Sequence, residues 1–251
     1  MTPRVGVVTQ ARTSSTRLPG KVLEQVGGTT LIEHQLDRLA RSGLEVFVAT
    51  TTNTGDDPLA AIAQARGLGV HRGSEHDVLA RFSGCARAHD LDVVVRVTSD
   101  CPLIDGDLVA RGIEEWLAAG DPDLYLSNCL VRTFPRGFDF EVFGAQALHE
   151  ASAAARASEE REHVTPYLYR NAGGRTTLRN LTRETDESRY RVTVDTAADL
   201  VLVRVLIETY GAHRLDCEGI LDVLRAHPEL AVLHAEVAQK ELDATQDAVD
   251  C

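Results

Sequence analysis

The sequence predicts an α/β fold with a mostly parallel central sheet flanked by helices. Three observations predict it: the chain length, the composition and the alternation of segment types. The 251 residues suffice for one sizeable α/β domain, and 43% hydrophobic with 25% charged residues is an ordinary globular composition. Short β-branched runs alternate with longer helical patterns, which is typical of parallel α/β sheets. We expect a single domain over residues 1–251, with an excursion at about 125–185 and a helical C-terminal tail at about 216–251.

The expected elements follow from periodicity and from end signals. β-branched runs predict strands at residues 4–9, 46–50, 92–97, 124–127, 139–143, 177–181 and 189–194. Helical periodicity predicts helices that begin near residues 30, 57 and 77, and helices at about 107–118, 145–156, 158–171, 197–210 and 217–226. Thr30 and Glu33 have capping-box spacing, and Asp57-Pro58 is typical of a helix start. Pro166 should bend its helix or mark a boundary.

Net charge and cysteine usage exclude several classes of protein. A formal charge of −12 disfavours a nucleic-acid or anionic-membrane surface, so a polyanionic ligand would need a local basic pocket. No apolar run approaches the roughly 20 residues that span a bilayer, and the N-terminal run is too short for a signal peptide. The five cysteines are scattered and form no CxxC pair, which predicts reduced thiols of a cytoplasmic protein, with no zinc site.

The loop after the first strand, residues 10–21, concentrates positive charge in an acidic protein. It carries Arg12, Arg17 and Lys21, with hydroxyl side chains between them and Pro19-Gly20 for a turn. Backbone N–H groups, hydroxyls, arginines and a lysine together suit a polyphosphate, and such loops hold ligands in open α/β sheets. The alternative is a solvated basic loop. Neither GxxxxGK[ST] nor GxGxxG is present, so a P-loop or a dinucleotide site is not supported.

A series of colinear segments resembles a known family. The segments are QARTSSTRLPGK, VATTTNTGDDPL, VHRGSEHDVLARF, VVVRVTSDCPLID, YLSN, FPRGFDFEVF, SEEREHVTPY and RVTVDTAADLVLVR, between about residues 4 and 210. They resemble the cytidylyltransferases that make CMP-sugar acids, and within that family the SpsF-like branch of spore-coat polysaccharide biosynthesis. The resemblance implies a Rossmann-like, GT-A-like fold of nucleotide-diphospho-sugar transferases, CTP as substrate, transfer of CMP to an anionic acceptor with pyrophosphate release, and a homodimer formed through the excursion.

The resemblance also implies the nucleotide site. It places CTP against Ala11, Arg12, Ser15, Arg17, Lys21, Arg72 and Thr98. Lys21 and Arg12 would lie near the phosphates as catalytic residues, because Lys21 can stabilise charge that develops on the α-phosphate and the leaving pyrophosphate. Arg72 has an alternative role as a strand-end arginine, and Ser74 is better explained as a helix cap. Thr98 stands where the neuraminate branch commonly has glutamine, so specificity for sialic acid does not carry over.

Two distant carboxylates complete the expected catalytic set. Asp100 and Asp195 each follow a predicted strand, and the family uses both matching positions for metal. Mg²⁺ prefers a few carboxylates with phosphate oxygens and waters, so two aspartates and a triphosphate suffice. The alternative is that each aspartate caps the following helix. Asp199 is expected to act at the helix start instead.

The remaining expectations concern the acceptor-binding residues and the alternative functions. By resemblance, acceptor contacts fall on Asn128, Arg136, Glu141, Arg161 and His163. Arg136 can bind a carboxylate, phosphate or phosphonate with its guanidinium, and His163 has the alternative of a structural hydrogen bond. A GT-A glycosyltransferase remains an alternative through the DxD-like residues 121–123, as does a non-catalytic binding protein. The sequence does not identify the acceptor.

Overall fold

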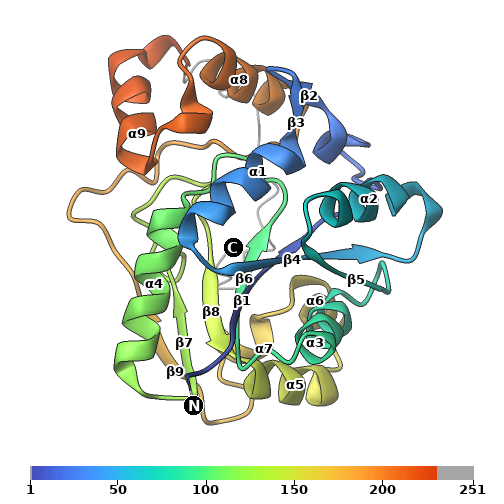
Figure 1. Cartoon of the computed structure of the whole chain (residues 1–251). Coiled ribbons are helices and arrows are strands. Elements are labelled where there is room, and N and C mark those ends of the chain that lie inside the picture. The colour runs from blue at the N-terminus through green and yellow to red at the C-terminus, as the bar shows by residue number, and fades with distance from the viewer. Residues whose placement is uncertain (1, 231–251) are drawn as a thin grey trace.

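The structure is a computed structural model in which residues 2–230 are described. Its main sheet contains β1 (Val5–Gln10), β4 (Glu45–Thr51), β5 (Gly69–Gly73), β6 (Val93–Thr98), β7 (Leu124–Ser127), β8 (Glu141–Gly144) and β9 (Thr177–Asn180). The strand order is β5-β4-β1-β6-β8-β7-β9 (Figure 1). Only β8 runs antiparallel to its neighbours in this sheet, which confirms the predicted mostly parallel fold. A separate antiparallel pair joins β2 (Gln25–Val26) to β3 (Thr29–Thr30).

Helices cover both faces of the sheet (Figure 1). They are α1 (Leu31–Leu39), α2 (Asp57–Ala65), α3 (Val78–Ala88), α4 (Gly106–Ala119), α5 (Ala145–Ala154), α6 (Ser158–His163), α7 (Pro166–Tyr169), α8 (Ala197–Glu208) and α9 (Cys217–Ala226). Side chains alternate across each strand, so Val93 and Val95 of β6 join one core cluster while Val94 joins the other. The first cluster packs against α1, α2 and α4, and the second packs against α3 and α5.

The sheet topology creates the place for a ligand. The chain builds β1, β4 and β5 toward one edge and then returns to place β6 on the other side of β1. At this reversal the loops that follow β1 and β6 leave two adjacent strands at the carboxyl edge of the sheet, and open α/β sheets bind ligands at such a switch point. The register sets Gln10 beside Thr98 at the carboxyl ends of the two strands. The predicted basic loop therefore begins next to the loop that carries Asp100.

Two predicted segments differ from the structure in an informative way. The predicted strand at 189–194 is wrong, because only Arg191 makes a β-bridge, an isolated one with Arg136. Gly137 at φ 109° lies so close to Val192 that a Cβ there would be 2.7 Å from its Cγ2, and a regular strand gives way to this loop–loop contact. The predicted helical stretch 158–171 is divided into α6 and α7, with Pro166 as the first residue of α7, so the expected boundary at proline is confirmed.

Further expectations from the sequence concern the cysteines, membrane spans and the C-terminal tail. Cys85, Cys101 and Cys217 are free and buried. Cys129 is not among these free thiols, so the expectation of reduced thiols is confirmed only for the other three described cysteines. Within residues 2–230, no helix has both the length and the apolar character needed to span a bilayer. Most of the predicted helical tail lies outside the described residues.

Candidate active site

The basic loop after β1 is held in place by a turn and by an anchor to a neighbouring loop. Gly20 adopts a left-handed conformation with φ 72°, and its N–H donates to the Thr13 carbonyl at 2.8 Å. Thr13 donates from its N–H and its hydroxyl to one oxygen of Asp56, each at 2.7 Å. The turn leads into the 3₁₀ helix Lys21–Leu23, so Lys21 begins a defined element and its side chain is almost fully buried.

A second loop brings Asp195 to the same place from the other end of the sequence. Thr196 caps α8, and Asp199 completes the capping box. One oxygen of Asp199 also accepts from the backbone N–H of Asp195 at 2.9 Å, so the residue before the cap is held as well. The expectation that Asp199 acts at the helix start is thereby confirmed.

The loop that carries Asp100 is joined to both of these segments. The N–H of Val194 donates to the carbonyl of Asp100 at 2.7 Å, which sets the two predicted metal-binding loops side by side. Gln35 on α1 is fully buried and donates to the carbonyls of Thr98 and Cys101 at 2.6 and 3.2 Å. These bonds position both ends of the loop around Asp100.

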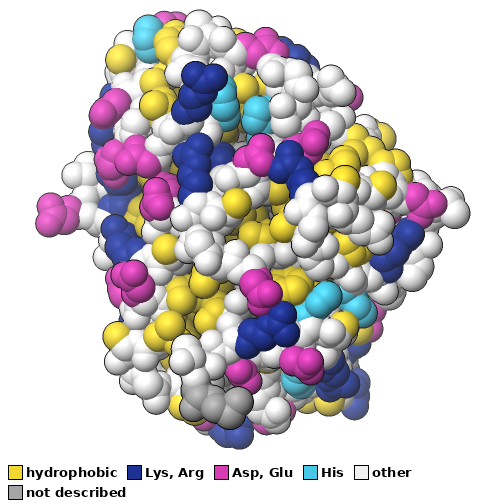
Figure 2. Space-filling model, viewed as in Figure 1, with side chains coloured by type: hydrophobic (Ala, Val, Ile, Leu, Met, Phe, Trp, Pro, Cys, Tyr) yellow, Lys and Arg dark blue, Asp and Glu magenta, His cyan; other side chains and the backbone are white. Residues whose placement is uncertain are grey.

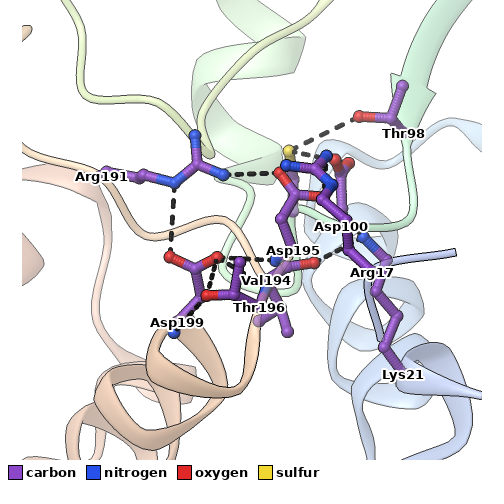
Figure 3. A network of polar contacts seen from close by, with 10 residues as sticks. Arg17, Lys21, Thr98, Asp100, Arg191, Val194, Asp195, Thr196 and Asp199 are labelled. Carbon is purple, nitrogen blue, oxygen red and sulfur yellow. Dashed lines mark hydrogen bonds and ion pairs between the residues drawn. The ribbon is translucent and has the colours of Figure 1, made fainter. Parts of the chain in front are cut away.

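Three cations meet on the carboxylate of Asp195 (Figure 3). Lys21 Nζ lies 2.8 Å and Arg17 Nη2 2.9 Å from Oδ1, while Arg191 Nη2 lies 2.5 Å from Oδ2. Lys21 also donates to the carbonyl of Val194 at 2.6 Å. Burial acts to raise the pKa of Asp195, but the charges of Lys21, Arg17 and Arg191 outweigh burial and lower it. Asp195 is therefore an anion around which residues from both ends of the chain are organised.

These groups line a cavity of about 470 Å³. Its walls are formed by Gln10, Ala11, Arg12, Ser15, Thr16, Arg17, Lys21, Val78, Arg81, Arg96, Thr98, Ser99, Asp100, Cys101, Arg136, Asp139, Glu162, His163, Arg191, Thr193 and Asp195. Seven of these are Lys or Arg and four are Asp or Glu, although the whole chain carries −12. On the face in Figure 2, by contrast, basic and acidic side chains are interspersed. The excess of positive charge in the cavity fits an anionic ligand.

Unsatisfied polar atoms in the cavity wall also indicate a ligand. Gln10 Oε1, Arg81 Nε and Thr193 Oγ1 are buried and have no hydrogen-bond partner within the described part of the chain. Buried polar atoms in folded proteins are nearly always paired, so each exception needs an explanation. A polar ligand with its waters supplies one here.

The donor set fits a divalent metal that is shared with a substrate. Asp100 and Asp195 supply carboxylate oxygens to one cavity, and magnesium accepts few protein ligands when phosphates and waters complete its shell. Among residues 2–230 no group of three or more His, Cys, Asp or Glu side chains could hold a metal. Asp195 is already paired with Lys21, Arg17 and Arg191, so a metal bound there would share this carboxylate with the three cations or displace one of them.

Most of the sequence-predicted site residues come together in this cavity. The lining includes Ala11, Arg12, Ser15, Arg17, Lys21, Thr98, Asp100, Arg136, His163 and Asp195. Ser74 accepts from the N–H of Asp77 at 3.1 Å, in agreement with its expected role at a helix start. The residues 121–123, considered for a glycosyltransferase, lie in the turn before β7 and do not line the cavity.

Four predicted residues are directed elsewhere. Arg72 donates to the carbonyls of Thr51 and Asn53 at 2.7 and 2.8 Å and pairs with Asp57 at 2.6 Å, as a strand-end arginine would. Arg161 pairs with Asp77. Neither side chain lines the cavity.

The other two lie in the buried interior near β7 and β8. Asn128 donates to the Phe138 carbonyl at 2.8 Å. Glu141 is 1% exposed and accepts from the hydroxyls of Tyr125 and Thr165 at 2.5 and 2.6 Å. Its second oxygen pairs with Arg96, which does line the cavity. Glu141 is thus placed to orient Arg96 and not to contact a ligand.

The sequence-based prediction missed several lining residues, and five of them carry charge: Arg81, Arg96, Asp139, Glu162 and Arg191. Arg96 interrupts the valine run of β6, and a lone charge in a buried strand is a signal that could have identified it. Burial raises the pKa of Asp139, although Arg132 lies 2.5 Å away and opposes the shift. A carboxyl with a raised pKa in a cavity is suited to accept a proton.

Comparisons with known proteins identify a family and a fold that the chain matches. The profile of a cytidylyltransferase family matches residues 7–218. The chain is 30% identical to the spore coat polysaccharide biosynthesis protein SpsF of Bacillus subtilis over 233 residues, which are 89% of this chain and 95% of that protein. A solved cytidylyltransferase from Leptospira borgpetersenii is 33% identical with a TM-score of 0.87, covering 94% of this chain and 99% of that one.

A more distant structure resembles the chain in fold. It is a CMP:2-keto-3-deoxy-manno-octonic acid synthetase in complex with CTP, with 20% identity and a TM-score of 0.60. The superposition covers 82% of this chain and 99% of that one. The expected Rossmann-like nucleotidyltransferase fold is confirmed.

Proposed function

The chain belongs to the cytidylyltransferase family, and we propose that it transfers CMP from CTP to an anionic acceptor with magnesium as the metal. The acceptor is a sugar acid or a related carboxylate or phosphonate, and pyrophosphate is released. One observation carries the proposal: Lys21, Asp100 and Asp195 line one cavity at the reversal of strand order, and that cavity has more cations than carboxylates. The 30% identity to SpsF supports a role in surface-polysaccharide synthesis.

The reaction needs charge stabilisation more than covalent help from the protein. An acceptor oxygen attacks the α-phosphorus of CTP, a new O–P bond forms, and the bond to the bridging oxygen breaks with its electron pair on pyrophosphate. Lys21, Arg12 and Arg17 lie in the loop that faces these phosphates and offset the developing negative charge. A bound Mg²⁺, held by Asp100 and Asp195, would add charge neutralisation and help to orient the α-phosphate.

The acceptor is proposed to bind at the wall that contains Arg136 and His163. The backbone of Arg136 forms a β-bridge with that of Arg191. The two arginines therefore line the cavity from adjacent segments of the same chain. Such a pair suits a carboxylate or a phosphonate. Asp139, whose pKa is raised by burial, lies at the same cavity and can take the proton from a hydroxyl nucleophile. A nucleophile that is already an anion needs no base.

A screen of acceptors tests this function. The protein is mixed with Mg²⁺, CTP and each member of a set of nonulosonic acids, other sugar acids and small phosphonates, and pyrophosphate is measured. Release that requires CTP, metal and one acceptor supports the proposal, with ATP, GTP and UTP as competitors for nucleotide choice. Consumption of a sugar nucleotide without CTP would favour a glycosyltransferase, and CTP binding without any turnover across the set would favour a binding protein.

We also propose a homodimer that forms through the excursion. β9 is the terminal strand of the sheet, so one of its backbone edges is unpaired by other strands of that sheet. Leu178 on β9 and Val131 beside it are 46% and 65% exposed, and Asn180 ties the two segments together. An edge strand with exposed apolar side chains is a site for association. Light scattering should give twice the 27.3 kDa chain mass, and a Leu178→Lys variant should give the monomer mass.

A further inference from the structure

Arg81 is a buried arginine whose charge has no ion-pair partner among the described residues. It lies on α3, is 2% exposed and lines the cavity. Its guanidinium makes one hydrogen bond within the described residues, from Nη1 to the carbonyl of Ser74 at 2.7 Å. Nε has none, and no carboxylate of the described chain forms an ion pair with it. A charge removed from water without a partner costs free energy, and a protein keeps it where something repays that cost.

The protein groups around Arg81 do not offset the free-energy cost of burying its charge. The charges that act most on it belong to Arg12, Asp56 and Glu75, and Arg12 is a like charge. Asp56 is engaged by Thr13, and Glu75 pairs with Arg12 at 3.8 Å. Burial first, and then Arg12, lower the pKa of Arg81 to about 10, which reflects how poorly the site accommodates its charge. An anion placed between Arg12 and Arg81 would relieve both effects.

Arg38 provides an internal comparison. It is 1% exposed, and burial lowers its pKa to about 10 as well. Unlike Arg81, it donates to four carbonyls at 2.6 to 3.1 Å, those of Ile104, Ala212, His213 and Leu215. Its Nη2 has no partner in the described part of the chain. It does not line the cavity. Arg38 therefore joins several loops through its hydrogen bonds, whereas the equally buried Arg81 binds a single carbonyl.

The packing of α3 keeps Arg81 in place. At the end of β5, a Cβ on Gly73 would lie 3.1 Å from Cγ and 3.3 Å from Cβ of Arg81. A side chain at Gly73 would require the Arg81 stem to shift by a few tenths of an ångström, so the stem is closely packed between the helix and the strand. A confined stem leaves the guanidinium few alternative positions.

We propose that Arg81 binds the phosphate end of the nucleotide together with Arg12. This inference rests on the proposed function for the identity of the anion. Arg81 and Arg12 bind the β- and γ-phosphates from two sides, while Lys21 acts at the α-phosphate.

The test compares two matched variants, Arg81→Met and Arg38→Met, with Arg81→Lys as a milder change. Affinities for inorganic tripolyphosphate and for cytidine are measured by calorimetry, and melting temperatures are measured without ligand. Arg81→Met should bind tripolyphosphate at least about tenfold more weakly with cytidine affinity unchanged, and Arg81→Lys should fall between it and the wild type. Without ligand, the melting temperature of Arg81→Met should stay within about 2 °C of the wild-type value or rise, because the substitution removes an unpaired buried charge. Arg38→Met should melt lower and keep its tripolyphosphate affinity.

The outcomes separate this inference from the proposed function. Equal tripolyphosphate affinity in wild type and Arg81→Met would overturn it, as would a melting temperature that falls as far as in Arg38→Met. A loss of affinity for cytidine alone would place Arg81 at the nucleobase and would also overturn the inference. Arg81-dependent binding of tripolyphosphate by a protein that turns over no CTP would support it while the proposed function fails.

Discussion

The Asp195→Asn substitution tests the ion network that joins the two ends of the chain. The side chain of Asp195 is 12% exposed and binds Lys21, Arg17 and Arg191. Asparagine has nearly the same shape but no charge, so the three cations lose their common anion. Of the three, Arg191 alone keeps a second carboxylate within residues 2–230, that of Asp199 at 3.4 Å. We expect the variant to fold and to be markedly less stable.

The magnitude follows from the contacts. Removing one partner of a buried ion pair costs about 3–5 kcal/mol. The pair with Arg17 contributes little, because that side chain is 46% exposed. The amide oxygen of asparagine still accepts one hydrogen bond, which returns about 1 kcal/mol. The net expectation is a loss of about 3 kcal/mol, or about 6–12 °C in melting temperature for a domain of this size.

The pH dependence gives the experiment its sign. The folded-state pKa of Asp195 is lower than the ordinary value of 3.8, so its stabilising contribution is present above that value and is lost as pH falls through the lower folded value. The difference in melting temperature between wild type and Asp195→Asn should be largest near pH 7 and should narrow below about pH 4.

Calorimetric or fluorescence melting without ligand measures both effects. Asp37→Asn is the control, since that carboxylate is 58% exposed in its pair with Arg66 and should change the melting temperature by less than about 2 °C. A shift for Asp195→Asn no larger than this control, or a shift that grows as the solution becomes acidic, would refute the reasoning.

The remaining predictions concern catalysis and packing. Lys21→Ala and Asp100→Asn should each lower kcat at least about tenfold with the acceptor found by the screen, because each removes transition-state charge stabilisation, and near wild-type kcat would contradict the assigned role. Glu141→Gln should lower the free energy of unfolding by about 3 kcal/mol in denaturant titrations, because Glu141 is the buried carboxylate that pairs with Arg96. Unchanged stability would refute that placement. Gly106→Ala should lower the free energy of unfolding by at least about 1–3 kcal/mol, because its Cβ would lie 2.3 Å from the Arg38 carbonyl oxygen, and unchanged stability would contradict this contact.

Features that depend on neighbours in sequence could be predicted from the sequence. The helix starts at Thr30 and Thr196 follow from capping residues three positions apart, and both capping boxes form. The valine run of β6 predicts a central strand, which it is. The basic loop is also local, because Arg12, Arg17 and Lys21 lie within ten residues and Gly20 makes the turn that the proline–glycine pair suggests.

The partners of each charge were decided only by the tertiary structure. Glu141 was predicted to contact the acceptor, yet it lies beneath the cavity wall and holds Arg96. Arg81 and Arg191 enter the cavity from a helix and from a loop that the sequence predicts as a strand. Whether a side chain meets a ligand depends on which segments pack against it, and those segments lie up to about 170 residues away, as Lys21 and Asp195 do. Residue types and local periodicity therefore determine the elements and the supply of charge, whereas burial and long-range packing determine which charges remain for the ligand.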